Sequence, residues 1–289
     1  MNFPKISIVT PVFNRVEYLE QTILSVIDQG YPNLEYIVID GGSTDGTLEI
    51  IKKYEDRIFY WTSEPDNGMY DAINKGFKKA SGQIMAWINS DDLYHQRSLF
   101  SVAGIFNDLP DVDWIFGMPA FYNHNHVCVK ITKSRGWSKE RFFIGDYKWI
   151  QQENVFWRRS LWEKSGGLGA EYKYAGDLDL WSRFFHHSVL HNVETSFAGF
   201  RLHGNQLSIT GEKTYLREAE LVYKAVISRY FKKGELAVAR SLYNRISAYR
   251  NSRPGVKRKL AALLSVMLEK RINAPGLIYY DFSDHQWKK

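Results

Sequence analysis

Short apolar runs and helical repeats alternate along the first ninety residues of the chain. The apolar runs cover residues 5–10, 34–39, 58–62 and 84–88. Between the first two, apolar side chains recur at helical spacing from residue 16 to residue 27, and further helices are expected through residues 50–54 and 70–80. This alternation predicts an α/β fold with a Rossmann-like, mostly parallel central sheet flanked by helices.

A polar or turn-forming residue stands at the end of each run: Pro11, Asp40, Glu64 and Asp91. Because the carboxyl ends of parallel strands meet at one edge of a sheet, where open α/β folds bind ligands, we expect these residues to border one crevice. Asp91 and Asp92 are adjacent carboxylates, and such hard oxygen ligands can hold a divalent cation together with a diphosphate. The alternative for this pair is a helix cap or a turn.

Seven motifs follow one another between about residues 6 and 208. They are TPVFNR, IDGGSTDGT, SEPDNGMYDAINKG, INSDD, QQENVFWRRSLWEKSGGL, YAGDLDLWSRF and FRLHGNQLS. In this order and spacing they resemble a family 2 glycosyltransferase, an inverting nucleotide-sugar transferase of the GT-A fold. The resemblance implies a catalytic domain over residues 1–210, with a nucleotide-binding half (1–95) and an acceptor half (96–210). The motifs do not extend beyond it, and we expect residues 211–289 to form a basic helical C-terminal region.

The resemblance assigns the nucleotide and donor contacts to residues near the strand ends. It implies that Asp40 accepts a hydrogen bond from a pyrimidine ring. The remaining contacts that it implies are Pro11, Phe13 and Arg15 as the opposite wall of the base pocket, and Asp66, Asp71 and Asn74 near the nucleotide or donor. Each has a plainer alternative: Asp40 opens a turn into two glycines, and Asp71 and Asn74 lie on an exposed helix face.

A divalent metal, Mn²⁺ or Mg²⁺, is also implied by the resemblance. Asp92 is the expected direct ligand, with Asp91 as a second ligand or a ribose contact. Relatives usually carry Asp where this chain has Asn89, so one negative charge is missing here. His203 is expected to be a third ligand or a phosphate contact, and its alternative is a purely structural role.

Asp177 resembles the catalytic base of the family. The acidic residue that usually precedes the base is Gly176 here, so one carboxylate of the pair remains, and its alternative is an N-cap. Asp179 lies two residues on, and because a helix turns about 100° per residue, the two side chains point about 200° apart. We therefore expect Asp179 to pair with Arg183 at i+4 instead.

Two other assignments concern the second half of the chain. Gln152 and Glu153 fall in the segment that the resemblance assigns to the acceptor. Trp181 is expected in the core, with a place facing the sugar as the alternative.

The charge is unevenly distributed. The chain carries a net +6, but from residue 215 to the end there are 16 Lys or Arg and 6 Asp or Glu, so this segment has +10 and the remainder −4. Basic residues flank a short apolar stretch between residues 257 and 271, which predicts a helix lying on anionic lipid; an ordinary solvated helix is the alternative. No basic-aromatic RNA-recognition motif is present, so a nucleic acid is not an expected partner.

Cysteine content and hydropathy bear on the compartment. A single cysteine, Cys128, excludes a disulfide framework and suits a reducing compartment. The N-terminus enters a strand at once, which leaves no room for a signal peptide, and no apolar run approaches the roughly 18 residues of a membrane span. We therefore expect a cytoplasmic protein, placed at the inner face of the cell membrane where the basic region meets lipid.

Together these observations predict a metal-dependent inverting glycosyltransferase. It would move a sugar from a nucleotide-diphosphate donor, a UDP-sugar, to a glycan or lipid-linked acceptor in bacterial polysaccharide biosynthesis. Two other classes stay open. A nucleotidyltransferase of similar fold would need a glycine- and basic-rich loop where Phe13, Asn14 and Arg15 stand, and a non-catalytic nucleotide or glycan binder is favoured by Asn89 and Gly176 at acidic positions.

Overall fold

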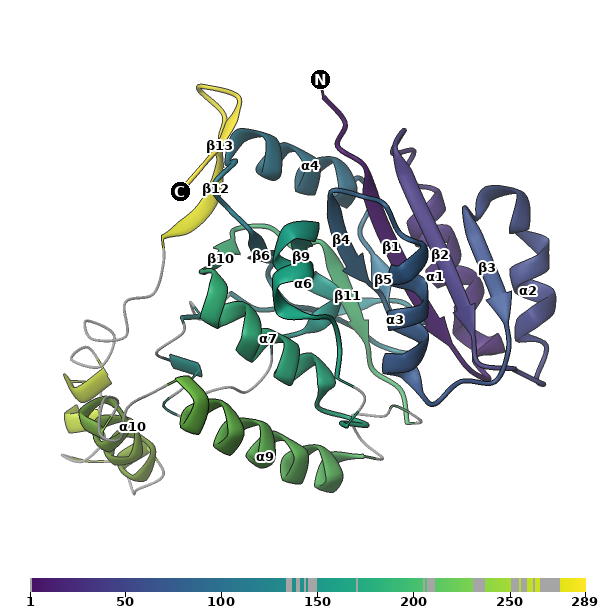
Figure 1. The fold of residues 1–289 in the computed structure, drawn as a ribbon. Helices are drawn as coiled ribbons and strands as arrows, with labels where there is room; N and C mark the ends of the chain where they lie inside the picture. Colours follow the sequence, from purple (N-terminus) through teal and green to yellow (C-terminus); the bar gives the residue numbers. More distant parts are fainter. Residues whose placement is uncertain are drawn as a thin grey trace.

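The computed structural model describes most of the chain. The described residues are 2–133, 137–138, 141–142, 144, 150–169, 171–204, 206, 211–230, 237–250, 255, 259–261, 263–265 and 276–289. Across these residues, nine strands form a central sheet in the order β13-β12-β10-β6-β9-β4-β1-β2-β3, and four more form a smaller sheet, β5-β11-β7-β8. Helices flank the central sheet (Figure 1), which confirms the predicted α/β fold class.

The first half is the parallel part of the sheet. Strands β1 (Ile6–Val12), β2 (Leu34–Asp40), β3 (Tyr60–Ser63) and β4 (Ile84–Trp87) all run in one direction. Helices α1 (Val16–Ile27), α2 (Thr47–Lys53) and α3 (Met69–Lys79) alternate with them, and a short 3-10 turn (Glu55–Arg57) precedes β3. All seven residues of β1 are buried, because such sheets are covered on both faces, and this explains its nearly continuous apolar sequence.

The second half turns the sheet from parallel to mixed. Strand β9 (Val155–Arg158) follows the 3-10 turn Gln152–Asn154 and runs antiparallel to both β4 and β6 (Trp114–Phe116). Beyond it, β10 (Leu190–Val193) is parallel to β6. Helices α4 (Ser98–Asp108), α6 (Arg159–Ser165) and α7 (Gly176–His187) belong to this half, and α6 packs on α7.

The smaller sheet contains strands from both halves and lies near the carboxyl ends of the parallel strands. It consists of β5 (Leu93–Tyr94), β11 (Ala198–Arg201), β7 (Ala120–Tyr122) and β8 (Cys128–Ile131). Because β5 follows the turn after β4 directly and pairs with β11, Arg201 and the residues after it lie beside Asp91 and Asp92.

The C-terminal part differs from the expected helical region. Helices α9 (Glu212–Tyr230) and α10 (Ala237–Arg250) are present, and α9 lies along α7 (Figure 1). The last residues, however, form a hairpin of β12 (Leu277–Asp281) and β13 (Gln286–Lys288), and β12 extends the central sheet by pairing with β10. Ile278 on β12 is fully buried there, so the basic C-terminal region also contains a strand that packs into the core.

The lipid-binding prediction is only partly covered by the structure. Lys257, Arg258, Lys270 and Arg271 lie outside the described residues. Among the helices that are described, none is long and apolar enough to cross a membrane.

Aromatic side chains fill the core between the sheet and α7. The ring of Trp181 lies parallel to that of Trp87 at 5.5 Å and also stacks on Trp114, while Trp157 contacts Trp87 and Trp181 edge-on. All four are at most 1% exposed. The predicted core position of Trp181 is therefore confirmed, and this packing holds the start of α7 against the carboxyl edge of the sheet.

Candidate active site

The turn after β4 carries the two adjacent carboxylates. The Thr22 hydroxyl on α1 lies 2.8 Å from the backbone oxygen of Asp92 and 3.0 Å from that of Ser90. The backbone N–H of Asp92 donates to the Asn89 backbone oxygen at 3.1 Å. These contacts fix the turn so that the neighbouring carboxylates have different surroundings.

Asp92 is turned inward. Its side chain is buried, one carboxylate oxygen accepts a hydrogen bond from the Arg201 backbone N–H at 3.0 Å, and the other lies 3.4 Å from the Asn89 amide nitrogen. Burial, followed by the charges of Asp91 and Glu153, raises the pKa of Asp92 well above its usual value. In this geometry Asp92 ties the turn to β11.

Asp91, in contrast, is partly exposed. Its Oδ2 lies 3.1 Å from Nε2 of His203 and 3.7 Å from Nε of Arg15, and its side chain is 17% exposed. The His203 ring in turn packs 4.7 Å from the ring of Tyr18. Three predicted residues, Arg15, Asp91 and His203, are thus brought together from segments far apart in the sequence.

A buried arginine lies behind this group. The side chain of Arg201 is fully buried, and its guanidinium carbon lies 4.7 Å from the centre of the Tyr18 ring. Its three guanidinium nitrogens have no hydrogen-bond partner among the described residues. Since a buried charge without hydrogen bonds is costly, this cation suits a site where negative charge gathers.

Asp40 shapes the turn after β2. Its carboxylate accepts hydrogen bonds from the backbone N–H groups of Gly42 and Ser43, at 3.2 and 3.0 Å, and from the hydroxyls of Ser43 and Ser63, at 2.5 and 2.6 Å. Gly42 has φ +85°, which glycine adopts without strain. The turn role of Asp40 is therefore observed, and its contact with a pyrimidine stays a prediction.

The wall opposite Asp40 differs in exposure from one residue to the next. Pro11 is buried within β1, whereas Phe13 is 59% exposed and offers an open aromatic face at the end of that strand. Asp66 approaches from the other side, because Gly41 lacks a side chain: a Cβ at Gly41 would stand 2.7 Å from the Asp66 carboxylate.

Two predicted donor contacts on α3 are engaged within the protein. Asp71 accepts a hydrogen bond from the Asn67 backbone N–H at 3.0 Å and lies 3.6 Å from Lys75. The Asn74 amide binds the backbone of Leu168 at both ends, donating to its oxygen at 2.9 Å and accepting from its N–H at 3.2 Å. Asn74 therefore fastens the loop after α6 to α3, a structural role that the sequence did not indicate.

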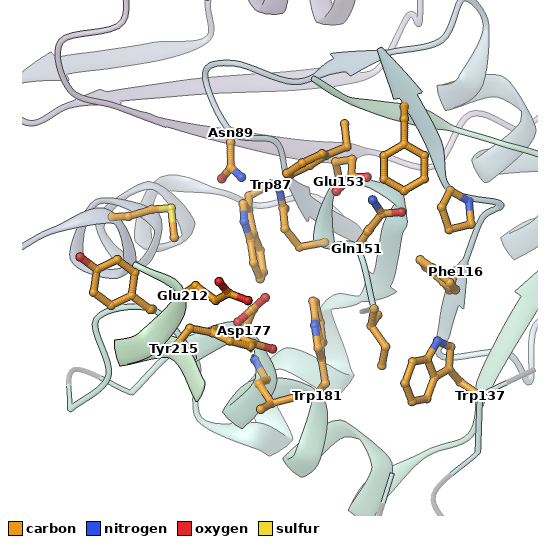
Figure 2. A pocket seen from close by; sticks show the side chains of 18 of the residues that line it. Trp87, Asn89, Phe116, Trp137, Gln151, Glu153, Asp177, Trp181, Glu212 and Tyr215 are labelled. Carbon is orange, nitrogen blue, oxygen red and sulfur yellow. Dashed lines mark hydrogen bonds between the residues drawn. The ribbon is translucent and has the colours of Figure 1, made fainter. Parts of the chain in front are cut away.

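A cavity of about 640 Å³ opens beside this edge of the sheet. Aromatic rings from both halves line it, including Tyr70, Trp87, Phe116, Trp137, Trp181 and Tyr215. The polar groups among its lining residues include Asn89, Gln151, Gln152, Glu153, Asp177 and Glu212 (Figure 2). A mostly apolar cavity with a few polar groups is typical of a small-molecule site.

Asp177 lies on the wall of this cavity. It is the second residue of α7, and Ala175 occupies the N-cap position, so the N-cap alternative for Asp177 was wrong. Its carboxylate accepts from the Leu178 backbone N–H at 2.8 Å and from the Tyr70 hydroxyl at 3.3 Å. Burial raises the pKa of Asp177 to about 6, which makes it a stronger base than an ordinary carboxylate.

The glycine before Asp177 has a steric explanation. A Cβ at Gly176 would stand 2.6–2.9 Å from three ring carbons of Tyr70. Tyr70 therefore occupies the space that an acidic side chain at position 176 would need. Glycine at position 176 is therefore explained by its packing against the Tyr70 ring.

Asp179 faces away from the cavity, as expected from the helical period. Its carboxylate binds Nε and Nη2 of Arg183 at 3.0 and 2.7 Å. The predicted i+4 ion pair is confirmed.

Glu153 supplies a second buried carboxylate. It is 1% exposed and accepts from the Asn154 side-chain amide at 3.2 Å. Burial raises its pKa to about 7. Beside it, neither amide atom of Gln152 has a hydrogen-bond partner among the described residues, which suits a polar ligand in the cavity.

Comparison with known proteins decides the family. The model of the family "Glycosyl transferase family 2" matches residues 7–161, more than half of the chain. The chain belongs to glycosyl transferase family 2. An uncharacterized glycosyltransferase of Rickettsia typhi is 27% identical over 250 residues, covering 84% of this chain and 78% of that protein. A putative teichuronic acid biosynthesis glycosyltransferase of Bacillus subtilis, TuaG, is 38% identical over 99 residues, covering 33% of this chain and 39% of TuaG.

Solved structures confirm the fold of the transferase. TarS 1–349 of S. aureus, in complex with UDP-GlcNAc, matches with a TM-score of 0.59 at 16% identity, covering 93% of this chain and 88% of that one. The transferase spans about half, 53%, of the longer TarS chain. The mannosyltransferase PcManGT of Pyrobaculum calidifontis, in complex with GDP-Man and Mn²⁺, matches with a TM-score of 0.58 at 16% identity, covering 91% of this chain and 80% of that one. The glycosyltransferase assignment favours sugar transfer over the nucleotidyltransferase alternative.

The residues at the crevice fit a weakly held divalent cation. No group of three or more His, Cys, Asp and Glu side chains comes together among the described residues. Asp91 and His203 are nevertheless adjacent, and Mg²⁺-type sites often use one or two carboxylates together with the phosphates of the substrate. The two carboxylates differ in accessibility: the Asp91 side chain is partly exposed, whereas the Asp92 carboxylate is buried and bonded to the Arg201 backbone N–H.

Several residues of the site were not predicted. Tyr70, Arg201 and Tyr18 stand in or beside the motifs, but nothing in their spacing shows that they contact Asp177 or surround Asp91. Glu212, Tyr215 and Leu216 reach the cavity from α9, in the region that was expected to be separate. Only the fold brings them to the site.

Proposed function

We propose that the transferase moves a sugar from a UDP-sugar to a hydroxyl group of a glycan or lipid-linked acceptor, with inversion at the anomeric carbon. The observation that carries this proposal is the position of Asp177. Its carboxylate lines a cavity next to the carboxyl edge of the parallel strands, and burial raises its pKa to about 6. A carboxylate with such a pKa is ionised at neutral pH and is still basic enough to accept a proton.

The nucleotide would lie across the ends of β1 and β2. Phe13 offers an exposed ring, and Asp40 and Asp66 flank the turn after β2. The nucleobase and the ribose would bind at this turn. Arg15 and the buried Arg201 supply positive charge near Asp91, which favours binding of the diphosphate. Asp71 would contribute through the loop before α3, which it holds by its bond to Asn67.

Asp91 and His203 would hold the divalent cation, with Asp92 supporting the turn. When bound, Mn²⁺ or Mg²⁺ neutralises charge on the leaving diphosphate. The transferase's own residues orient the reactants: the aromatic walls exclude water, and Asp177 removes the proton of the acceptor hydroxyl. That oxygen then attacks the anomeric carbon from the face opposite the nucleotide, and a single displacement inverts the stereocentre.

The acceptor would lie in the cavity, which Gln152 and Glu153 line together with residues of α9. Rings such as Trp87 and Tyr215 provide apolar faces for a sugar, and the Gln152 amide, which has no hydrogen-bond partner within the described part of the chain, suits its hydroxyl groups. The biosynthetic setting, assembly of a bacterial polysaccharide, is supported by the similarity to TuaG. The basic C-terminal region would add a peripheral contact with anionic lipid at the inner face of the membrane.

Donor hydrolysis tests the proposal. The purified transferase is incubated with UDP-, GDP- and dTDP-sugars and Mn²⁺, without acceptor, and free sugar is measured. We expect slow release of sugar from a UDP-sugar, because water can replace the acceptor. Metal-dependent UDP binding without release from any donor would contradict the proposal and support a non-catalytic binder.

A further inference from the structure

We propose that Glu218, on the C-terminal helix α9, is a positioning residue for Asp177. The inference rests on the proposed role of Asp177 as the base. It makes α9 part of the catalytic unit, where the sequence indicated a separate appendage.

Glu218 binds three consecutive backbone N–H groups just before α7. One carboxylate oxygen accepts from Tyr174 at 2.8 Å and from Ala175 at 2.9 Å, and the other accepts from Lys173 at 3.2 Å. Hydrogen bonds to an ionised acceptor are about twice as strong as neutral ones. A single side chain of α9 therefore fixes the backbone that leads directly into Asp177.

The start of α7 has no side-chain cap of its own. Ala175 occupies the N-cap position and has no side-chain acceptor, and the first helical bond runs from the Asp179 N–H to its backbone oxygen at 3.0 Å. Glu218 binds the N–H of the N-cap residue Ala175 from another helix, a contact that a Glu at N3 provides locally in a capping box. Its negative charge also lies at the positive end of the α7 dipole.

Tyr70 holds the same segment from the opposite side. Its hydroxyl lies 3.0 Å from the Tyr174 backbone oxygen and 3.3 Å from the Asp177 carboxylate. Tyr174 is therefore bound through its backbone N–H by α9 and through its backbone oxygen by α3. With both contacts in place, the approach to α7 has little freedom to rotate.

The helix that carries Glu218 is itself anchored. Ala219 and Val222, on the face next to Glu218, are fully buried, and α9 packs on α7. Three residues before Glu218, Tyr215 lines the cavity that contains Asp177 (Figure 2). Displacement of α9 would therefore change both the wall of the cavity and the position of the base.

The test compares Glu218→Ala with the matched control Glu220→Ala. Glu220 lies on the same helix, is exposed and pairs with Lys224. We expect Glu218→Ala to lower kcat by up to roughly 10²-fold, the cost of a displacement of about 1 Å at a reacting group, with UDP affinity unchanged. The acid limb of the pH–rate profile should shift, because the surroundings of Asp177 change. Glu220→Ala should match the parent protein in all three measurements.

Amide hydrogen exchange gives a readout that does not depend on catalysis. The N–H groups of Tyr174 and Ala175 should exchange faster in Glu218→Ala and at the parent rate in Glu220→Ala. Glu218→Gln keeps one acceptor oxygen and should recover part of kcat and part of the protection.

Three outcomes would overturn the inference. The first is amide exchange in Glu218→Ala at the parent rate, and the second is faster exchange in Glu218→Ala with kcat and the acid limb of the pH–rate profile unchanged. The third is a fall in kcat in Glu220→Ala as large as that in Glu218→Ala. If Glu218→Ala does not fold, Glu218→Gln is used instead. The inference is then overturned if Glu218→Gln has the same kcat and the same amide exchange rates as the parent protein. A parent protein that turns over no donor refutes the proposed function, and exchange alone then decides whether Glu218 holds this segment.

Discussion

Two glutamates with almost no exposed surface differ in the direction of their pKa shift, one in each half of the molecule. Glu35 on β2 is 3% exposed and Glu153 at the cavity is 1% exposed. Burial raises the pKa of Glu35, but hydrogen bonds from Ser7, Ser81 and Lys5 outweigh it and lower the pKa to about 2. For Glu153 burial prevails, and the pKa rises to about 7.

Two things differ: Glu153 lies deeper in the protein, and Glu35 has more hydrogen-bond donors. Glu35 accepts from the Ser7 hydroxyl and from both the N–H and the hydroxyl of Ser81, and it lies 3.1 Å from Lys5. The side-chain donor to Glu153 among the described residues is the Asn154 amide. A buried carboxylate with several hydrogen-bond donors stays ionised and stabilises the fold. A buried carboxylate with few donors keeps a higher affinity for a proton. Asp177 belongs to the second kind.

The largest expected effect comes from removing the proton acceptor at the cavity. Asp177→Asn should lower the transfer rate by about 10²–10⁴-fold, the usual contribution of general-base catalysis, with UDP affinity nearly unchanged. In the parent, the rate should fall below pH about 6, where Asp177 becomes protonated, and this limb should be absent in the variant. Transfer assays across pH and UDP titrations measure both effects.

The control for this variant is Asp179→Asn on the same helix. It breaks the ion pair with Arg183 and should lower stability while leaving the pH–rate profile unchanged. A parent-like rate in Asp177→Asn, or a slow but folded Asp179→Asn, would show that the wrong face of α7 has been assigned to the cavity.

A smaller effect should separate the two adjacent carboxylates. Asp91→Ala should weaken Mn²⁺-dependent UDP binding by about 10- to 100-fold, because Asp91 lies in the crevice beside His203. Asp92→Asn keeps an acceptor for the Arg201 N–H and should change this affinity less. Calorimetry with UDP, with and without Mn²⁺, makes the comparison. Greater loss in Asp92→Asn would restore Asp92 as the direct ligand.

The smallest effects should appear in stability, where the two glutamates are predicted to differ in sign. Glu35→Gln should destabilise the transferase at neutral pH by about 1–3 kcal/mol, since it disrupts several hydrogen bonds to a charged group. Because the folded-state pKa of Glu35 is depressed from 4.5 to about 2, its contribution is present above pH about 4.5 and is lost as pH falls towards 2.

Glu153→Gln should raise the stability of the transferase at pH 8. The folded-state pKa of Glu153 is raised from 4.5 to about 7, so the carboxylate increasingly opposes folding as pH rises through that window. Urea denaturation of both variants at pH 5 and pH 8 checks the pair. Destabilisation of equal size at pH 8 would mean that donor count does not distinguish the two sites.

The local periodicity and motifs of the sequence were enough to predict the parallel half of the fold and the family. The runs ending at Pro11, Asp40 and Asp91 became parallel strands, because each buries apolar residues on both faces. The Asp179–Arg183 pair was also predictable, since one helical period fixes it. The placement of Asp91, Arg15 and His203 at one edge is consistent with the expected site.

Contacts between residues far apart in the sequence could be seen only in the tertiary structure. Strand β12 pairs with β10, more than eighty residues earlier in the chain, so its short apolar run could not be distinguished from a helix end. Asp91 and Asp92 are neighbours of identical chemistry, and only the position of the Arg201 N–H turns one inward. Asp177 gains its raised pKa, its Tyr70 contact and the Glu218 support before it from burial among α3, α7 and α9. These are contacts across sequence distances where local patterns carry no information, so only the packed chain could specify them.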